Sequence, residues 1–194
     1  MKKWLVIGLV LFGFYQWWNS REVLHAPGVL VAESPYQQST SVQPFQFKSY
    51  QIAPLAEFSL SARVLSRENY SLDAGADLAP IDLALGWGAM SDNQVIDQLS
   101  ISQSGRFYFW SWQNQPPISN RQIIQSSSNM HMVPVDDYIA NQLKDVRKGD
   151  IIQLRGLLIE ANKSNGWKWR SSLSRDDTGN GACELFFVKE VSVL

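Results

Sequence analysis

The strongest strand pattern in this sequence is the run IIQLRGLLIE, which extends from Ile151 to Glu160. Apolar and polar residues alternate in its first half, as they do in a strand with one buried face. The inward phase then shifts by one residue, from Leu154 to Leu157. Because the shift is centred on Gly156, we expect a bulge or bend there, as at the corner of a barrel.

A helix is predicted directly before this strand. Asp136 is a suitable N-cap, and Ile139, Leu143 and Val146 recur at helical spacing. We therefore expect one clear helix near residues 136–148.

Several other segments have strand patterns. The segment 107–112 carries bulky side chains on both faces, so it is either a central strand or has one face covered by another segment. Strands, then one helix, then strands predict a mainly β (α+β) domain resembling an OB-like β-barrel. A two-layer α+β sheet and an SH3-like barrel stay open. The other expected strands are 58–65, 81–90 (as a short strand or turn), 130–133 and 185–188, with an extension to 193 left open.

The N-terminus has the pattern of a membrane anchor. Lys2 and Lys3 precede an apolar run over residues 4–18, with aromatic residues near its end. We expect an uncleaved transmembrane helix over residues 1–18. Because the lysines precede the run, its N-terminus is expected in the cytoplasm, which makes the chain a single-pass protein of the inner (cytoplasmic) membrane with an extracytoplasmic domain. A signal cleaved near Ala26 or Ala32 is the alternative.

The segment after this run is predicted to be a linker. Residues 19–55 contain several prolines and an uncharged polar run, which favour a linker that is either extended or wrapped on the domain. The globular, β-rich domain is expected over residues 56–194.

The composition restricts the class of partner. Seventeen basic and eighteen acidic residues give a net charge of −1, which argues against a general nucleic-acid binder. The single cysteine excludes an intramolecular disulfide. The predicted anchor implies a membrane contact through residues 4–18. Together with the near-zero net charge, it favours a protein or envelope partner.

The segment 166–184 concentrates the unusual side chains, and we expect it to form a hairpin. Its first part reads as a strand to residue 174, with tryptophans on one face and cations on the other, leading into an acidic, glycine-containing loop. We expect Arg170 or Arg175 to pair with Asp176. A recognition surface is favoured, with a plain solvated strand face as the alternative. The predicted ligand-binding residues are Trp167, Lys168, Trp169, Arg170, Arg175, Asp176 and Asp177.

An envelope cysteine hydrolase is the alternative function. Cys183 would be the nucleophile and His131 the base, oriented by Asp137, with Asp136 or Glu184 as further options. However, Cys183 begins an apolar strand, where cysteine is usually a small buried hydrophobe. No complete catalytic set is evident, so the sequence favours a binding or accessory domain over an enzyme.

No metal or cofactor is predicted. Outside the linker there is one histidine and one cysteine, short of a zinc ligand set. The loop from Asp176 resembles the start of an EF-hand, but Phe187 stands where a glutamate is needed. A looser calcium site from Asp176, Asp177 and Asn180 stays open. The triplet at residues 177–179 matches that of aspartic proteases but has no second copy.

Three runs, LAPIDLALGWG (78–88), SNMH (128–131) and SLSRDDTGNGACE (172–184), are similar to those of a family of short, membrane-tethered bacterial proteins with no assigned activity. The resemblance covers most of residues 58–188. It is compatible with a bacterial envelope location and implies no catalytic residues.

Overall fold

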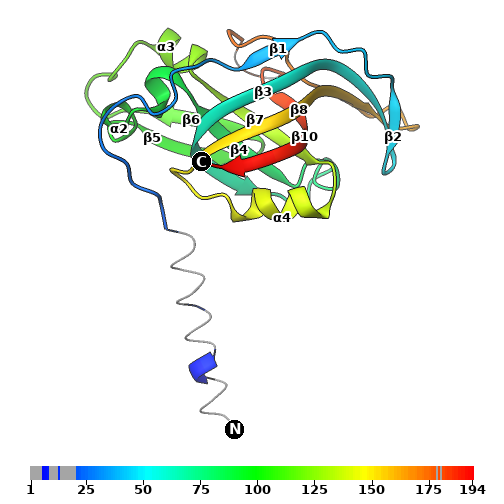
Figure 1. Ribbon diagram of the computed structural model, residues 1–194, viewed down its shortest axis with the longest axis horizontal. Helices are drawn as coiled ribbons and strands as arrows, with labels where there is room; N and C mark the ends of the chain where they lie inside the picture. The colour runs from blue at the N-terminus through cyan, green and yellow to red at the C-terminus, as the bar shows by residue number, and fades with distance from the viewer. Residues whose placement is uncertain (1–5, 9–12, 14–20, 178, 180) are drawn as a thin grey trace.

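The computed structural model describes residues 6–8, 13, 21–177, 179 and 181–194, and its β-rich part is shown in Figure 1. The strands are β1 (Tyr36–Gln38), β2 (Phe45–Phe47), β3 (Tyr50–Asn69), β4 (Ile81–Gly86), β5 (Ser100–Ser104), β6 (Phe107–Ser111), β7 (Ser127–Pro134), β8 (Ile151–Asn162), β9 (Lys168–Arg170) and β10 (Glu184–Val193). The helices are the 3₁₀ turn η1 (Gly88–Ser91), α2 (Asn93–Ile96), α3 (Asn120–Gln125) and α4 (Asp137–Asp145). The mainly β prediction is confirmed.

Five of these strands pair in a closed cycle. The order is β3-β4-β7-β10-β8, and β8 pairs back with β3 along most of its length. The β7–β10 pair is parallel, and the other four are antiparallel. The helix α4 lies between β7 and β8 in the chain. Asp136 caps it as expected, accepting a hydrogen bond from the backbone N–H of Ile139 at 2.8 Å.

The main core lies inside this cycle. Along β3, Phe58, Leu60, Ala62 and Val64 are buried in it, as their alternation predicts. The other strands contribute inward residues at the same period. The helix α4 adds Ile139 and Leu143, so it covers part of the core with the apolar stripe seen in the sequence.

The expected change of phase at Gly156 is wrong. Leu154 and Leu158 belong to the same core cluster, so the inward period of two continues through the glycine. Leu157 and Ile159 are buried on the opposite face, in a second cluster. The register shifts lie on the neighbouring strands β3 and β10. Gly156 is needed because a Cβ there would overlap the Phe187 carbonyl oxygen.

Two smaller clusters cover the outside of the cycle. One lies under β2, β9 and the aromatic rings of Tyr50, Trp167 and Trp169. The other lies under the two-stranded β5–β6 sheet and the short helices. The strand β6 is therefore not central. Instead, one of its faces is covered by other segments, which was the second of the two expectations for residues 107–112. Its Tyr108 and Trp110 face the protein, while Phe107 and Phe109 are exposed.

The described part of the predicted linker is wrapped on the domain. Strands β1 and β2 pair with β3, which itself begins at Tyr50. Nearer the N-terminus, the backbone N–H of Val23 donates to the Lys148 carbonyl, and the His25 ring lies 2.7 Å from the Gly149 carbonyl oxygen. Residues 21–55 thus form part of the folded unit.

Within the described residues, no helix is both long and apolar enough to cross a membrane. The predicted anchor over residues 1–18 lies outside the described residues, except for 6–8 and 13.

Candidate functional site

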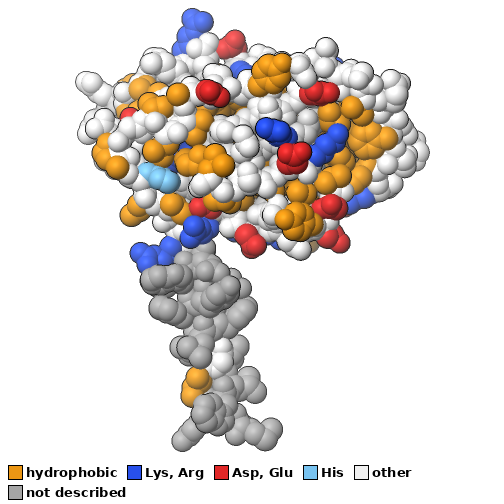
Figure 2. Space-filling view, in the orientation of Figure 1, with side chains coloured by type: hydrophobic (Ala, Val, Ile, Leu, Met, Phe, Trp, Pro, Cys, Tyr) orange, Lys and Arg blue, Asp and Glu red, His pale blue; other side chains and the backbone are white. Residues whose placement is uncertain are grey.

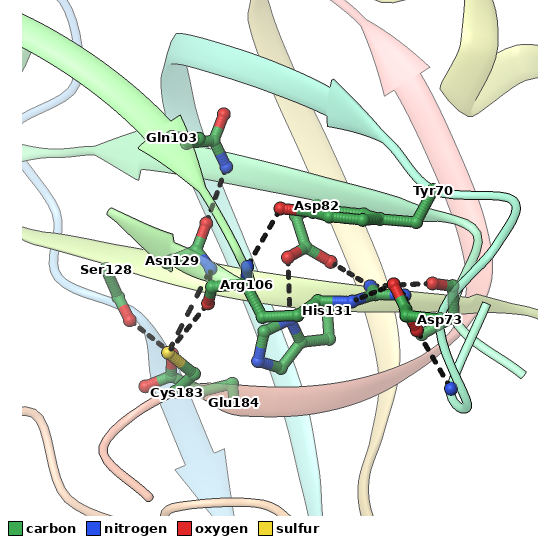
Figure 3. Close-up of polar contacts among 12 residues, drawn as sticks. Tyr70, Asp73, Asp82, Gln103, Arg106, Ser128, Asn129, His131, Cys183 and Glu184 are labelled. Carbon is green, nitrogen blue, oxygen red and sulfur yellow. Dashed lines mark hydrogen bonds and ion pairs between the residues drawn. The ribbon is translucent and has the colours of Figure 1, made fainter. Parts of the chain in front are cut away.

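A buried polar network lies on the outer face of β4 and β7, between the two outer clusters (Figure 3). It is centred on Arg106, at the turn between β5 and β6. Gly105 and Arg106 both have positive φ, 57° and 73°, as a two-residue type I′ turn requires. A left-handed conformation is unfavourable for arginine, so the contacts of its side chain must compensate.

The Arg106 guanidinium makes contacts on several sides. It donates to an Asp82 oxygen at 2.7 Å and to the Ala79 carbonyl at 2.8 Å, and it forms an ion pair with Asp73 at 2.9 Å. It also stacks on the Tyr70 ring, 3.7 Å from the ring centroid. These contacts fix the turn of the β5–β6 hairpin against β4 and the loop before it.

Asp82 joins Arg106 to His131. The Asp82 carboxylate is fully buried; one oxygen accepts from Arg106, and the other lies 2.9 Å from Nδ1 of His131. The second pair is close without the alignment of a regular hydrogen bond. The His131 ring packs against Trp169, with 4.7 Å between ring centroids. Asp82 therefore takes the orienting position that the sequence assigned to Asp137.

Asn129 connects the network to Cys183. Its amide donates to the Arg106 carbonyl at 3.0 Å and accepts from the Gln103 amide at 2.6 Å. The Cys183 sulfur lies 3.9 Å from both the Asn129 amide nitrogen and the Arg106 carbonyl oxygen. In the part of the chain that the structure describes, no hydrogen bond joins Cys183 to His131.

The Cys183 thiol is not activated. Burial raises its pKa to about 11, and the nearby negative charge of Glu184 acts in the same direction. The thiolate is the nucleophilic form, and its pKa is lowered where cations surround it. Cys183 is thus protonated at neutral pH.

Glu184 anchors the loop that precedes β10. Its side chain is 1% exposed, accepts from the Ser128 hydroxyl and pairs with Arg175 at 3.0 Å. Burial raises the pKa of Glu184 to about 7, although Arg175 acts to lower it. The same loop is closed by Ser172, whose hydroxyl donates to Asp177 at 2.6 Å.

A pocket of about 310 Å³ opens between β6 and this loop. Phe107 and Phe109 stand at one side, with exposed fractions of 42% and 51%. Asn129 lines it from β7, and Asp177 and Cys183 line it from the loop. The pocket therefore combines aromatic surface, neutral hydrogen-bonding groups and one exposed carboxylate.

The predicted tryptophan and cation strand is shorter than expected, although its tryptophans and cations lie on opposite faces as predicted. The strand β9 ends at Arg170, and both tryptophans are half-buried over an outer cluster. Lys168 and Arg170 point the other way and pair with Glu160 at 2.9 and 2.7 Å. The hydrogen bond from Arg170 contributes most to lowering the Glu160 pKa to about 2. Trp167 and Trp169 thus pack against this outer cluster.

The expected pairing of an arginine with Asp176 is wrong. Arg170 pairs with Glu160 and Arg175 with Glu184, while Asp176 accepts from the Gln125 amide at 2.6 Å. Asp177 lies at the pocket. Of the predicted ligand-binding residues, Asp177 thus lines the pocket, whereas Asn129 and the aromatic residues of β6 were not predicted as part of a site.

Asp137 is the first residue of α4, after the C-terminal end of β7, and in the described part of the chain no hydrogen bond or ion pair joins it to His131 or Cys183. Of the proposed hydrolase set, His131 joins the polar network through Asp82, and Cys183 joins it through Asn129 and the Arg106 carbonyl. Among the described residues, no group of three histidine, cysteine, aspartate or glutamate side chains could hold a metal ion. Asn180, part of the looser calcium alternative, lies outside them.

Asp82 and Arg106 were not among the site residues predicted from the sequence. A signal for Asp82 was present, because it is the one charged residue in the apolar run 78–86, and a charge in such a strand is usually paired. Arg106 follows a glycine between two polar and aromatic strands, which is a hairpin-turn signal. Neither signal reveals that the two side chains meet.

Comparison of the chain with protein-family models, with curated proteins and with solved structures found no match.

Proposed function

We propose that this protein is a binding or accessory domain that recognises a protein or envelope ligand at the pocket that β6 forms with Asp177, Gly179, Ala182 and Cys183. The pocket is the observation that carries the proposal. Exposed aromatic side chains stand beside neutral hydrogen-bonding groups, a combination typical of ligand sites. Its walls are fixed by the Arg106 and Glu184 contacts, so the site is largely formed before a ligand arrives.

The position of the pocket agrees with an OB-like barrel, which we also propose. The strand order β3-β4-β7-β10-β8, closed by β8 on β3, supports it. The helix α4 also supports it, because along the chain it lies between β7 and β8, the third and fourth of these strands. Small barrels of this type bind ligands on the face of their second and third strands. Here those strands are β4 and β7, which carry Asp82, Asn129 and His131 on that side.

Binding is favoured over hydrolysis because the nucleophile and base are not assembled. Cys183 contacts Asn129 instead of His131, and the raised pKa of its thiol opposes nucleophilic attack. His131 is held by Asp82 and covered by Trp169. We therefore interpret Cys183 and His131 as residues that support the pocket.

A protein or envelope partner is favoured over nucleic acid. The chain has a net charge of −1, and basic and acidic side chains are mixed on the face in Figure 2. Non-specific nucleic-acid binding depends on a basic surface. The apolar run behind Lys2 and Lys3 supports anchoring in the inner membrane with the domain outside the cytoplasm.

Site-specific photocrosslinking in the producing cells tests this function. A benzophenone amino acid replaces Phe109 at the pocket or, as the control, Tyr138 on α4, which is 68% exposed. A defined adduct, protein or glycan, is expected from position 109 and not from position 138. No adduct at 109, or the same adducts from both positions, would contradict the proposal.

A further inference from the structure

The strand β6 has an unpaired edge that opens into the pocket. It belongs to a two-stranded sheet and pairs only with β5 among the described strands. Tyr108 and Trp110 lie on this strand and also line the pocket. The opposite wall is formed by Asp177, Gly179 and Ala182.

The register of the hairpin determines which backbone groups point to that edge. Ser104 and Phe107 flank the two-residue turn, so they form a hydrogen-bonded pair. Hydrogen-bonded and non-hydrogen-bonded pairs alternate along an antiparallel ladder. Phe109 therefore bonds to β5, while the backbone N–H and C=O groups of Tyr108 and Trp110 point away from it. No other described residue bonds to those backbone groups.

This edge lacks the features that usually prevent strand addition. The run FYFWS over residues 107–111 contains no proline, no lysine and no other charge, and its register with β5 is unbroken. Its outward side chains, Phe107 and Phe109, are exposed phenyl rings. An edge of this composition is suited to main-chain hydrogen bonding with another segment.

We propose that β6 binds an extended segment of a partner protein as an added strand, with a basic side chain of that segment seated in the pocket. The inference rests on the proposed binding function and specifies its mode. An added strand lies about 4.8 Å from its neighbour, which places it over the pocket. A volume of about 310 Å³ is at the low end for ligand sites, so it holds one side chain.

The charge and the walls of the pocket define the occupant. The exposed Asp177 carboxylate attracts a lysine or arginine, and the phenyl rings of Phe107 and Phe109 can stack on its alkyl part or its cation. The local cation Arg175 is already paired with Glu184. Because the wall formed by Asp177, Gly179 and Ala182 faces β6, a single strand fits there better than the β5–β6 hairpin of a second copy.

The test uses heptapeptides selected from a random displayed library against the full chain. For a selected peptide that carries a basic residue, amide hydrogen exchange at Tyr108 and Trp110 should slow by about tenfold on binding, while exchange at Phe109 stays unchanged. N-methylation of the peptide backbone at alternate positions should weaken binding by about tenfold, and methylation at the positions between them should not.

The variant Phe109→Lys adds a charge to the edge at an exposed site, so the fold should tolerate it and peptide binding should weaken by about tenfold. Circular dichroism checks that the variant folds. Failure to select any peptide, or binding that is insensitive to N-methylation, would overturn the inference. So would concentration-dependent dimers that protect the same two amides, which would assign the edge to a second copy. A glycan adduct at position 109 without protection of these amides would agree with the proposed binding function but contradict binding by an added strand.

Discussion

Replacing Arg106 by alanine should destabilise the fold far more than replacing a surface arginine. The Arg106 side chain is 16% exposed, and its partner Asp82 is fully buried. Removing one member of a buried ion pair leaves an uncompensated charge and costs about 3–5 kcal/mol. Both arginine and alanine carry a Cβ, so the left-handed φ of 73° is equally unfavourable in both and the loss reports the side-chain contacts.

Urea denaturation followed by tryptophan fluorescence measures this loss. The matched control is Arg170→Ala, because Arg170 also pairs with a carboxylate at 2.7 Å but is half exposed. For such a pair, the expected cost is about 0–1 kcal/mol. Combining Arg106→Ala with Asp82→Asn should cost less than the sum of the single changes, since the orphaned charge is gone.

A loss for Arg106→Ala no larger than that for Arg170→Ala would contradict a stabilising role of the buried Arg106–Asp82 pair. Additive losses in the double variant would also contradict that role, because Arg106 and Asp82 would then not be coupled. Arg106→Lys should be intermediate, since an ammonium keeps the charge but cannot bridge Asp73 and Asp82 in the way a guanidinium does.

Three further predictions concern single residues. Cys183 should react slowly with iodoacetamide at pH 7 and faster as pH rises toward its pKa of about 11; rapid labelling that His131→Ala suppresses would instead favour the hydrolase. The Glu184 pKa is raised from 4.5 to about 7, so the folded state binds the extra proton and stability should fall as pH rises through this window, by up to about 3 kcal/mol. Glu184→Gln should flatten that slope in urea titrations, and an unchanged slope would assign it to another group. Gly156→Ala should destabilise by about 2 kcal/mol or more, because its Cβ meets the Phe187 carbonyl; a neutral effect in thermal denaturation would show that the strands can separate there.

Some elements of the fold were predictable from local sequence, because they carry their own period or cap, whereas β1, β2 and the start of β3 lie in the predicted linker and β5 was not expected. The alternation of residues 58–65 marks β3, and Asp136 with its apolar stripe marks α4. These signals depend only on neighbours in the chain. The phase of β8 was misread at Gly156 because Leu157 and Ile159 are covered on the outer face by segments distant in sequence, which no local pattern reveals.

The site was predictable only in part for the same reason. The segment 166–184 contributes Asp177 and Cys183 to the pocket, yet its cations find partners by tertiary contact. Arg175 reaches Glu184 instead of its neighbour Asp176, and this places a buried ion pair where an exposed one was expected. Asp82 and Arg106, 24 residues apart, meet only once the hairpin folds back on β4.

The same residues hold the hairpin and shape the pocket, and this decides which variants can report on binding. Asn129 accepts from Gln103, donates to the Arg106 carbonyl and lines the pocket, so changing it alters both stability and the ligand site. Phe109 lines the pocket but is half exposed, away from the polar network. A loss of binding in an Asn129 variant is therefore ambiguous, whereas a loss in a folded Phe109 variant is evidence about the ligand.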